Sequence, residues 1–328
     1  MSNSALPKTR VLITGATGLL GRALMKVFTQ PSLEHIQLVG LGWSRYEKYV
    51  NQFPNELRKL DITNDKELSE FVNEFKPNVI IHAAAERRPD QCEGDKEKTQ
   101  KLNVGATEKL IELSKSVNST LFYISSDYVF DGENPPYDID AKTNPLSFYG
   151  KTKEESEQSI IKASKSDPSS FRYIILRVPV LYGYVENLKE CAVTVVAEQV
   201  IKARDTLQPI EIDNWQIRYP TCVEDVAHVC YELMISKQYN SIYHFSAQQM
   251  KTKYDMAIDM ANVLSIKDPQ SIIKPMNEKP SGAPRPHNAC LNIFHTVDTI
   301  KKNLNNPTIH LSIFETQLPL IFKDLKLI

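Results

Sequence analysis

The sequence has few cysteines and no pattern that would pair them. Its five cysteines are an odd number, are widely spaced and include no CxxC pair. They are Cys92, Cys191, Cys222, Cys230 and Cys290. This usage argues against a disulfide framework and against a zinc site, and it is typical of proteins kept in a reducing compartment. We therefore expect free thiols, no bound metal and a cytoplasmic protein, with the nucleus as the alternative compartment.

The sequence also lacks an excess of charge and a long hydrophobic run. The formal net charge is -1 over 328 residues, and no basic stripe with interleaved aromatics occurs. Such a chain has no global field that would attract nucleic acid or an anionic membrane. No stretch reaches the roughly 18 apolar residues of a membrane helix, and the first residues lack the apolar centre of a signal peptide. We expect neither a nucleic-acid nor a membrane partner.

What the sequence does contain is an alternation of short apolar runs with longer amphipathic segments. Strands are predicted at residues 36–40, 78–83, 121–125 and 173–178. Helical spacing of apolar residues marks the segments 65–75, 98–116 and 149–165. The predicted strands are apolar on both faces, as expected for strands that lie between two layers of helices. The pattern predicts an α/β fold with a doubly wound parallel sheet.

An apolar run near the N-terminus leads into three glycines, in the stretch VLITGATGLLG at residues 11–21. Gly15 suits a tight turn, Gly18 lets the backbone approach a pyrophosphate, and Gly21 lets the following helix pack closely on the strand. That helix would aim its free N–H groups at the phosphates. The alternative is an ordinary turn between a strand and a helix, where glycine is also common. As a dinucleotide site, the turn would contact the cofactor through Gly15, Thr17, Gly18, Leu19, Leu20 and Gly21.

The end of the second predicted strand indicates which nucleotide the turn would hold. Proteins that bind NAD usually carry an acidic residue there for the ribose 2′-OH, whereas those that bind NADP carry a basic group for the 2′-phosphate. This chain has no acid at that point and reads Gly42, Trp43, Ser44, Arg45. Ser44 and Arg45 suit a phosphate monoester, so NADP(H) is favoured over NAD(H). The alternative is that Arg45 is a solvated arginine in a surface loop.

Two further features fit the same cofactor. Asp61 follows a predicted strand at the sheet edge, where its carboxylate would accept a hydrogen bond from the adenine amino group or cap the next helix. The small residues Ala83, Ala84 and Ala85 stand at the end of another strand. They would let the ribose and phosphates lie close to the backbone, or they would let a helix pack closely there.

Tyr149 and Lys153 form a YxxxK pair that a helix places on one face. A nearby ammonium favours a phenolate, so we expect Lys153 to lower the pKa of Tyr149 toward neutrality. Tyr149 would then transfer the proton that accompanies hydride transfer at a carbonyl. Ser126 and Asp127, at the end of a predicted strand, complete the candidate catalytic group.

The glycine turn, the stretch SSDYVFDG at residues 125–132 and the stretch YGKTK at residues 149–153 resemble the extended short-chain dehydrogenase/reductase superfamily, in its dTDP-4-dehydrorhamnose reductase branch. The resemblance implies a Rossmann domain in which Ser126 holds the substrate carbonyl, Tyr149 is the acid and Lys153 also bonds the nicotinamide ribose. It places Asn103 in the proton relay beside the cofactor and Arg177 at a strand end on the cofactor side.

The resemblance also suggests a place for an anionic ligand in the smaller lobe. Arg218 and Arg285 lie near prolines in the region where sugar-nucleotide reductases bind a diphosphate. Either guanidinium would bind an anion such as a sugar nucleotide through two hydrogen bonds. The alternative is that both are surface arginines that support proline-rich loops.

A closer resemblance covers nearly the whole chain. It is carried by HAAAERRPDQCE (82–93), ECAVTVV (190–196), QIRYPTCVEDVA (216–227), TKYDMA (252–257) and GAPRPHNACL (282–291). These segments are similar to the regulatory beta subunits of methionine adenosyltransferase. That family binds NADP(H) and associates with a catalytic alpha subunit that makes S-adenosylmethionine. Its animal members extend into a basic and aromatic tail implicated in partner contact, whereas this sequence ends at Ile328.

Two functions follow from these resemblances. The first is a non-catalytic regulatory subunit that binds NADP(H) and the methionine adenosyltransferase alpha subunit; the second is an NADPH-dependent reductase of a 4-keto-6-deoxy sugar nucleotide. In both, residues 1–182 form the NADP(H)-binding Rossmann domain and residues 183–328 mostly form a smaller, interleaved lobe for substrate or partner. We expect about residues 222–246 to return to the Rossmann sheet.

Overall fold

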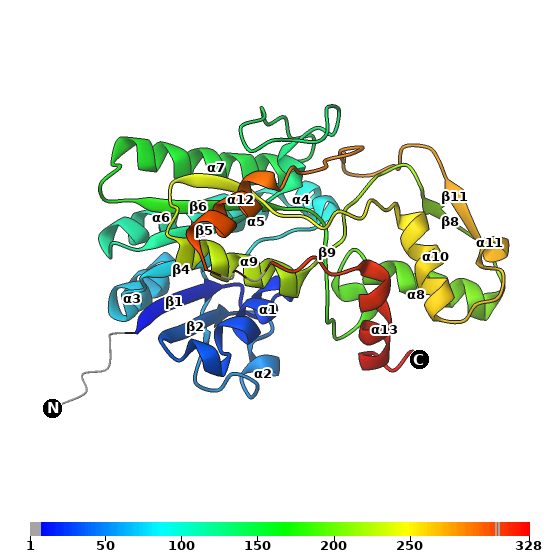
Figure 1. The fold of residues 1–328 in the computed structure, drawn as a ribbon, viewed down its shortest axis with the longest axis horizontal. Coiled ribbons are helices and arrows are strands. Elements are labelled where there is room, and N and C mark those ends of the chain that lie inside the picture. The colour runs from blue at the N-terminus through cyan, green and yellow to red at the C-terminus, as the bar shows by residue number, and fades with distance from the viewer. Residues whose placement is uncertain (1–7, 306, 308) are drawn as a thin grey trace.

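The computed structural model describes residues 8–305, 307 and 309–328, and its centre is a parallel sheet of seven strands (Figure 1). The strand order across the sheet is β10-β6-β5-β4-β1-β2-β3. Their bounds are β1 (Thr9–Thr14), β2 (Ile36–Gly42), β3 (Leu57–Lys59), β4 (Val79–His82), β5 (Thr120–Ser126), β6 (Arg172–Val178) and β10 (Ser241–His244). Every pair in this sheet is parallel. The predicted doubly wound α/β fold is confirmed.

Side chains that alternate along each strand enter two different cores. On β1, Val11 and Ile13 belong to one core and Leu12 to the other. The first core packs against α1 (Leu19–Phe28), α9 (Val223–Ser236) and α12 (Phe294–Asn303). The second packs against α3 (Asp65–Phe75), α6 (Ala106–Ser116) and α7 (Phe148–Ser166). Burial on both faces explains why these strands read as continuous apolar runs.

The direction of winding reverses between β1 and β4. From β1 the chain proceeds outward through β2 to β3, and then crosses over to β4, β5 and β6 on the other side. In doubly wound sheets, ligands bind outside the carboxyl ends of the strands at such a switch point. The topology therefore places a binding site beside the glycine turn that follows β1.

A smaller lobe projects from one end of the sheet (Figure 1). It contains α8 (Thr194–Thr206), α10 (Lys253–Val263), α11 (Pro269–Ile272) and the parallel pair β8 (Ile210–Asp213) and β11 (Ile273–Met276). The helix α13 (Phe314–Asp324) packs on α10. A second parallel pair, β7 (Leu181–Tyr182) with β9 (Thr221–Cys222), lies where the chain enters and leaves this lobe. The core of the smaller lobe is continuous with the core on the α1 and α9 face.

Several boundaries differ from the sequence-based expectation. The helix expected over 98–116 consists of α5 (Lys96–Gln100), a π-helical turn (Lys101–Gly105) and α6. The short strands β8 and β11 were not predicted, because each is only four residues long and half exposed. Short helical segments also occur: α2 (Tyr46–Tyr49), α4 (Pro89–Gly94), and single turns at Pro31–Leu33, Asp127–Val129 and Leu188–Glu190.

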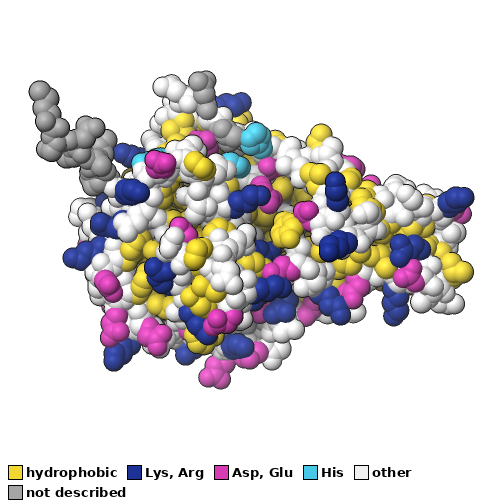
Figure 2. All heavy atoms as spheres, turned by 90° about the horizontal axis from the view of Figure 1, so that it is seen from below, with side chains coloured by type: hydrophobic (Ala, Val, Ile, Leu, Met, Phe, Trp, Pro, Cys, Tyr) yellow, Lys and Arg dark blue, Asp and Glu magenta, His cyan; other side chains and the backbone are white. Residues whose placement is uncertain are grey.

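The surface of the described part carries both signs of charge. On the face seen from below, basic and acidic side chains are interspersed and no region of a single sign dominates (Figure 2). None of the helices in the described ranges has the length and apolar character needed to cross a bilayer.

Candidate functional site

A cavity of about 820 Å³ opens at the switch point of the sheet. It is lined by the turn after β1, the ends of β2, β4, β5 and β6, the start of α7, and loops of the smaller lobe. Most of the predicted site residues share this cavity. They are Gly15, Thr17, Gly18, Leu19, Leu20, Gly21, Ser44, Arg45, Asp61, Ala83, Ala84, Ala85, Ser126, Asp127, Tyr149, Lys153, Arg218 and Arg285.

The glycine turn packs without room for side chains. Gly15 has a φ of 69°, and a Cβ added there would come within 2.8 Å of the Ala84 backbone. A Cβ on Gly21 would lie 2.0 Å from the Gly15 carbonyl oxygen, so this glycine lets α1 pack against the turn itself. The cap of α1 at Gly18 has no side-chain hydrogen bond, and its first turn has no acidic side chain. The free N–H groups at this helix end are therefore suited to an anion.

The contacts of Asp61 and of the alanines 83–85 differ in part from those expected from the sequence. The Asp61 carboxylate accepts hydrogen bonds from the Thr63 N–H at 2.9 Å and from the Thr63 hydroxyl at 2.8 Å. The cap of α3 is Asn64 instead, whose side chain accepts from the Glu67 N–H. Asp61 therefore shapes the loop that lines the cavity and does not cap the helix. Ala84 is the residue against which Gly15 packs, so its small size serves the turn.

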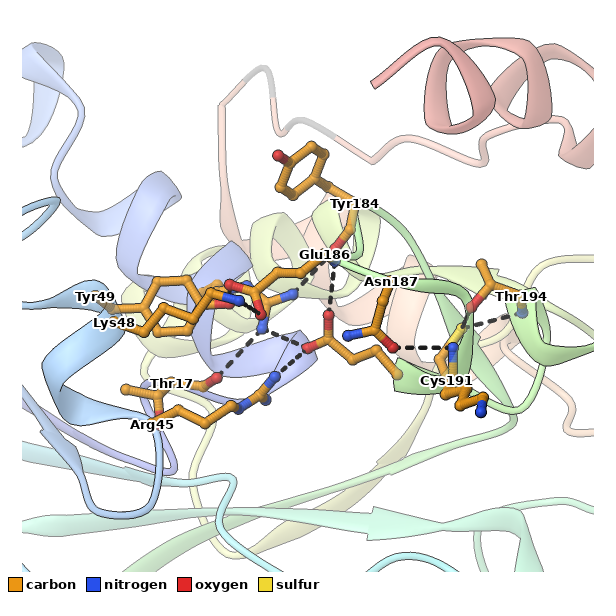
Figure 3. Close-up of polar contacts among 12 residues, drawn as sticks. Thr17, Arg45, Lys48, Tyr49, Tyr184, Glu186, Asn187, Cys191 and Thr194 are labelled. Atoms are coloured by element: carbon orange, nitrogen blue, oxygen red, sulfur yellow. Dashed lines mark hydrogen bonds and ion pairs between the residues drawn. The ribbon is translucent and has the colours of Figure 1, made fainter. Parts of the chain in front are cut away.

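Arg45 lies on the cavity wall and is tied to a distant acid. Its Nη1 atom lies 2.5 Å from Oε1 of Glu190, and the same oxygen accepts from Nη1 of Arg22 at 2.6 Å. Figure 3 shows Arg45 and the neighbouring Lys48 and Tyr49 facing the segment that carries Tyr184 and Glu186. The Arg45 side chain is 33% exposed, whereas that of Glu190 is 5% exposed. Glu190, the first residue of the stretch ECAVTVV, was not predicted from the sequence to belong to the site.

Tyr149 and Lys153 both reach the cavity from α7, which begins after the cap Ser147. The expected effect of Lys153 on Tyr149 is wrong. Burial raises the pKa of the Tyr149 phenol, a hydrogen bond with Ser126 opposes the rise, and the nearby Asp127 raises the pKa further. The Lys153 ammonium donates to the main-chain carbonyl of Ile124 at 2.7 Å. Burial also lowers the pKa of Lys153 to about 7, against the influence of Glu157. The phenol is therefore neutral in this arrangement.

The buried Ser126 and the half-buried Asp127 form a pair beside Tyr149. The Ser126 hydroxyl donates to Oδ1 of Asp127 at 2.9 Å. Burial raises the pKa of Asp127 to about 7, although the Ser126 bond and the charge of Arg218 act in the opposite direction. The Ser126 oxygen also accepts from the Tyr128 N–H at 3.2 Å. This arrangement stabilises the turn after β5 and places a titratable carboxyl on the wall of the cavity.

Two predicted residues are not brought to the cavity wall. Asn103 lies in the π-helical turn, where its amide nitrogen donates to Glu86 O at 3.0 Å and to the Thr152 hydroxyl at 3.1 Å. Arg177 points away from the cavity and forms a buried ion pair with Glu157, with Nη2 and Oε2 2.6 Å apart. At this end of β6 the cavity is lined by Val178 and Pro179. Side-chain alternation along the strand explains the difference, because neighbouring residues point to opposite faces.

The far end of the cavity carries three cations. Arg218 pairs with Asp213 at 3.0 Å, and Arg285 pairs with Asp90 at 2.6 Å. Lys253 also lines this end, and burial together with the charge of Arg218 lowers its pKa to about 8. The cations outnumber the two carboxylates that hold them, so this end is suited to an anionic group.

The chain is similar to known proteins over nearly its whole length. Residues 9–315 match the model of the RmlD substrate binding domain family. Methionine adenosyltransferase 2 subunit beta of Xenopus tropicalis is 41% identical over 288 residues, which cover 86% of this chain and 80% of that protein. The dTDP-4-dehydrorhamnose reductase of Aggregatibacter actinomycetemcomitans is 33% identical over 296 residues, covering 87% and 90%. A crystal structure of the Bacillus anthracis dTDP-4-dehydrorhamnose reductase in complex with NADP superposes with a TM-score of 0.74 at 25% identity, covering 98% of this chain and 100% of that one.

Proposed function

The chain belongs to the family of methionine adenosyltransferase 2 beta subunits, within the RmlD substrate binding domain family, and from this we propose that it is a regulatory subunit of methionine adenosyltransferase. In this role it binds NADP(H), associates with the catalytic alpha subunit and modulates S-adenosylmethionine synthesis without a turnover of its own. The observation that carries the proposal is the 41% identity to a beta subunit over 86% of the chain. We place this activity in the cytoplasm.

The geometry of the cavity supports a site that holds NADP(H). The glycine turn and the uncapped start of α1 would bind the pyrophosphate, and Ser44 and Arg45 would bind the 2′-phosphate. Asp61 and the alanines 83–85 lie where the adenosine would lie, and Tyr149 and Lys153 line the nicotinamide end. The related reductase of Bacillus anthracis was crystallised with NADP. When bound, NADP(H) would supply a hydride donor or acceptor at this end of the cavity.

The state of Tyr149 and Lys153 agrees with a cofactor that is held and not consumed. A reductase of this kind needs an acid that gives up its proton readily. Here burial raises the pKa of the Tyr149 phenol, and the Lys153 ammonium donates to a main-chain carbonyl. The raised pKa makes this phenol a weaker acid than such a reduction calls for.

Arg45→Ala should weaken NADPH binding by about tenfold and leave NADH binding nearly unchanged, because only NADPH carries the 2′-phosphate. Titration calorimetry with both nucleotides measures the two affinities. Lys48→Ala is the matched control, since Lys48 follows in the next helix but pairs with Glu186 and does not line the cavity. An equal loss for both nucleotides would remove the basis for preferring NADP(H).

A second candidate function is an NADPH-dependent reductase of a 4-keto-6-deoxy sugar nucleotide. It is favoured by the presence of Tyr149, Lys153 and Ser126 on one cavity. It is also favoured by the 33% identity to a dTDP-4-dehydrorhamnose reductase. Arg218 and Arg285 would then bind the diphosphate of the sugar nucleotide at the far end of the cavity.

Affinity purification from the native cell separates the two functions. We expect a methionine adenosyltransferase to co-purify in stable proportion, and Tyr149→Phe to co-purify equally well, because the phenol oxygen contributes only to reduction. The purified protein should not oxidise NADPH when given a dTDP-4-keto-6-deoxy sugar. NADPH oxidation that Tyr149→Phe abolishes, together with no associated methionine adenosyltransferase, would establish the reductase instead.

A further inference from the structure

We propose that Glu190 is a specificity-determining residue that opposes binding of the nucleotide 2′-phosphate by competing with it for Arg45. The inference deepens the proposed NADP(H) site and rests on it. The sequence places no acid at the end of β2, where NAD-binding proteins usually carry one. The fold supplies that acid from a position 145 residues farther along the chain.

Glu190 is held so firmly that it keeps its place without Arg45. Its Oε1 atom accepts from Arg22 at 2.6 Å, and its Oε2 atom accepts from the Glu186 N–H at 2.9 Å. Burial would raise the pKa of Glu190, but the bonds from Arg22, the Glu186 N–H and Arg45 hold it at about 2. The side chain is therefore a fixed negative charge with 5% exposure.

Arg22 is the permanent partner of this carboxylate. It rises from α1 with a side-chain exposure of 9%, and its other hydrogen bonds go to the carbonyl oxygens of Thr17 and Tyr184. Arg45 is the more exposed partner of Glu190. Arg45 lines the cavity, whereas Arg22 and Glu190 do not. Arg45 can therefore turn to a phosphate while the buried Arg22 continues to pair with Glu190.

That exchange lowers the affinity for NADPH and leaves the affinity for NADH unchanged. A phosphate within reach of Arg45 lies close to the Glu190 carboxylate, and Glu190 loses Arg45 as a partner when Arg45 turns to that phosphate. Like charges at this separation repel, and the repulsion is strongest where the environment excludes water. A ribose 2′-OH carries no charge and meets no such repulsion.

The same contact joins the nucleotide site to the segment 184–191. Besides the Arg45 contact, Glu186 pairs with Lys48 at 2.6 Å and with the Tyr49 hydroxyl, and Arg87 donates to the Glu190 carbonyl oxygen. Figure 3 shows Arg45, Lys48 and Tyr49 on one side, facing the segment of Tyr184 and Glu186 on the other. When Arg45 binds a phosphate, its contact with Glu190 is lost. Since coupling between two equilibria is reciprocal, the segment 184–191 is held less tightly when NADPH is bound than when NADH is bound.

Glu190→Gln tests the proposal, because the amide keeps the shape of the side chain and removes its charge. We expect the variant to bind NADPH about fivefold to tenfold more tightly and to bind NADH within about twofold of the unaltered protein. Glu186→Gln is the matched control: it removes a carboxylate from the same segment, but one that pairs with Lys48 and not with Arg45. Calorimetry with both nucleotides supplies the affinities.

Weaker or unchanged NADPH binding by Glu190→Gln would overturn the proposal, as would an equal gain for both nucleotides or the same gain in Glu186→Gln. If the Glu190→Gln variant fails to fold, hydrogen exchange of the unaltered protein tests the proposal instead. Amides of residues 184–191 must then exchange faster with NADPH than with NADH, and equal or slower exchange refutes the competition. If the unaltered protein binds NADPH but Glu190→Gln shows no gain, only the role of Glu190 fails. If neither the unaltered protein nor the variant binds a nucleotide, both the role of Glu190 and the proposed NADP(H) site are refuted.

Discussion

Gly21→Ala should lower the affinity for NADPH by roughly a hundredfold, because a methyl group there has no space. The added Cβ would lie 2.0 Å from the carbonyl oxygen of Gly15 and 2.8 Å from the backbone of Ala16. Both neighbours are backbone atoms of the turn, so relief requires the turn or the start of α1 to move. The free N–H groups of α1 would then leave the position in which they meet the pyrophosphate. Calorimetry with NADPH measures the loss.

Gly105→Ala is the matched control for this substitution. It also adds one methyl group to a helical glycine, but the nearest atom to its Cβ is the Gln100 oxygen at 3.9 Å. We expect NADPH affinity within about twofold of the unaltered protein and a melting temperature that is equal or higher, since alanine favours helix over glycine. Tight NADPH binding by Gly21→Ala would show that the turn adapts and that its close packing is not required.

Glu157→Gln should destabilise the fold by about 3–5 kcal/mol, because it leaves the buried guanidinium of Arg177 without a counter-charge. Both side chains are 3% exposed, and their nearest atoms are 2.6 Å apart. The Glu157 carboxylate also accepts from the Ser125 hydroxyl at 2.5 Å. Chemical denaturation followed by circular dichroism measures the change in the free energy of unfolding. Glu155→Gln, on the exposed side of the same helix, should change it by less than about 0.5 kcal/mol.

A double variant shows whether the loss of stability comes from an unpaired buried charge or from altered packing. Glu157→Gln combined with Arg177→Met removes both charges and should be more stable than Glu157→Gln alone. A double variant that is as unstable as the sum of the two single variants would contradict this explanation. The ion pair also affects the cavity, because Glu157 supports the charged form of Lys153 and its removal should lower the pKa of Lys153 further.

The parts of this molecule that follow from local chemistry could be predicted from the sequence. The strands on both sides of β1 are apolar at successive positions, and only a sheet covered on both faces accounts for that pattern. The order of elements then fixes the switch point and places the glycine turn, Ser126 and Tyr149 at one edge. These residues were found because each stands at the end of a strand or the start of a helix.

What could not be predicted depends on burial and on contacts between distant segments. Arg177 stands one residue before the cavity-lining Val178, and the sequence did not show which face of β6 each side chain takes. The pKa of Tyr149 is dominated by burial, which depends on how segments distant in the sequence pack around it. Glu190 belongs to a segment whose path over the nucleotide site has no local signal, so its contact with Arg45 appears only in three dimensions.

The interleaved path of the chain limits how recombination between genes could exchange its two lobes. The strand β10, which completes the sheet beside β6, is encoded between α8 and α10 of the smaller lobe, and α12 returns to β10 and α9 afterwards. A gene cut after Tyr182 would encode only six of the seven strands. Recombination at a single point therefore cannot exchange the smaller lobe as a cassette.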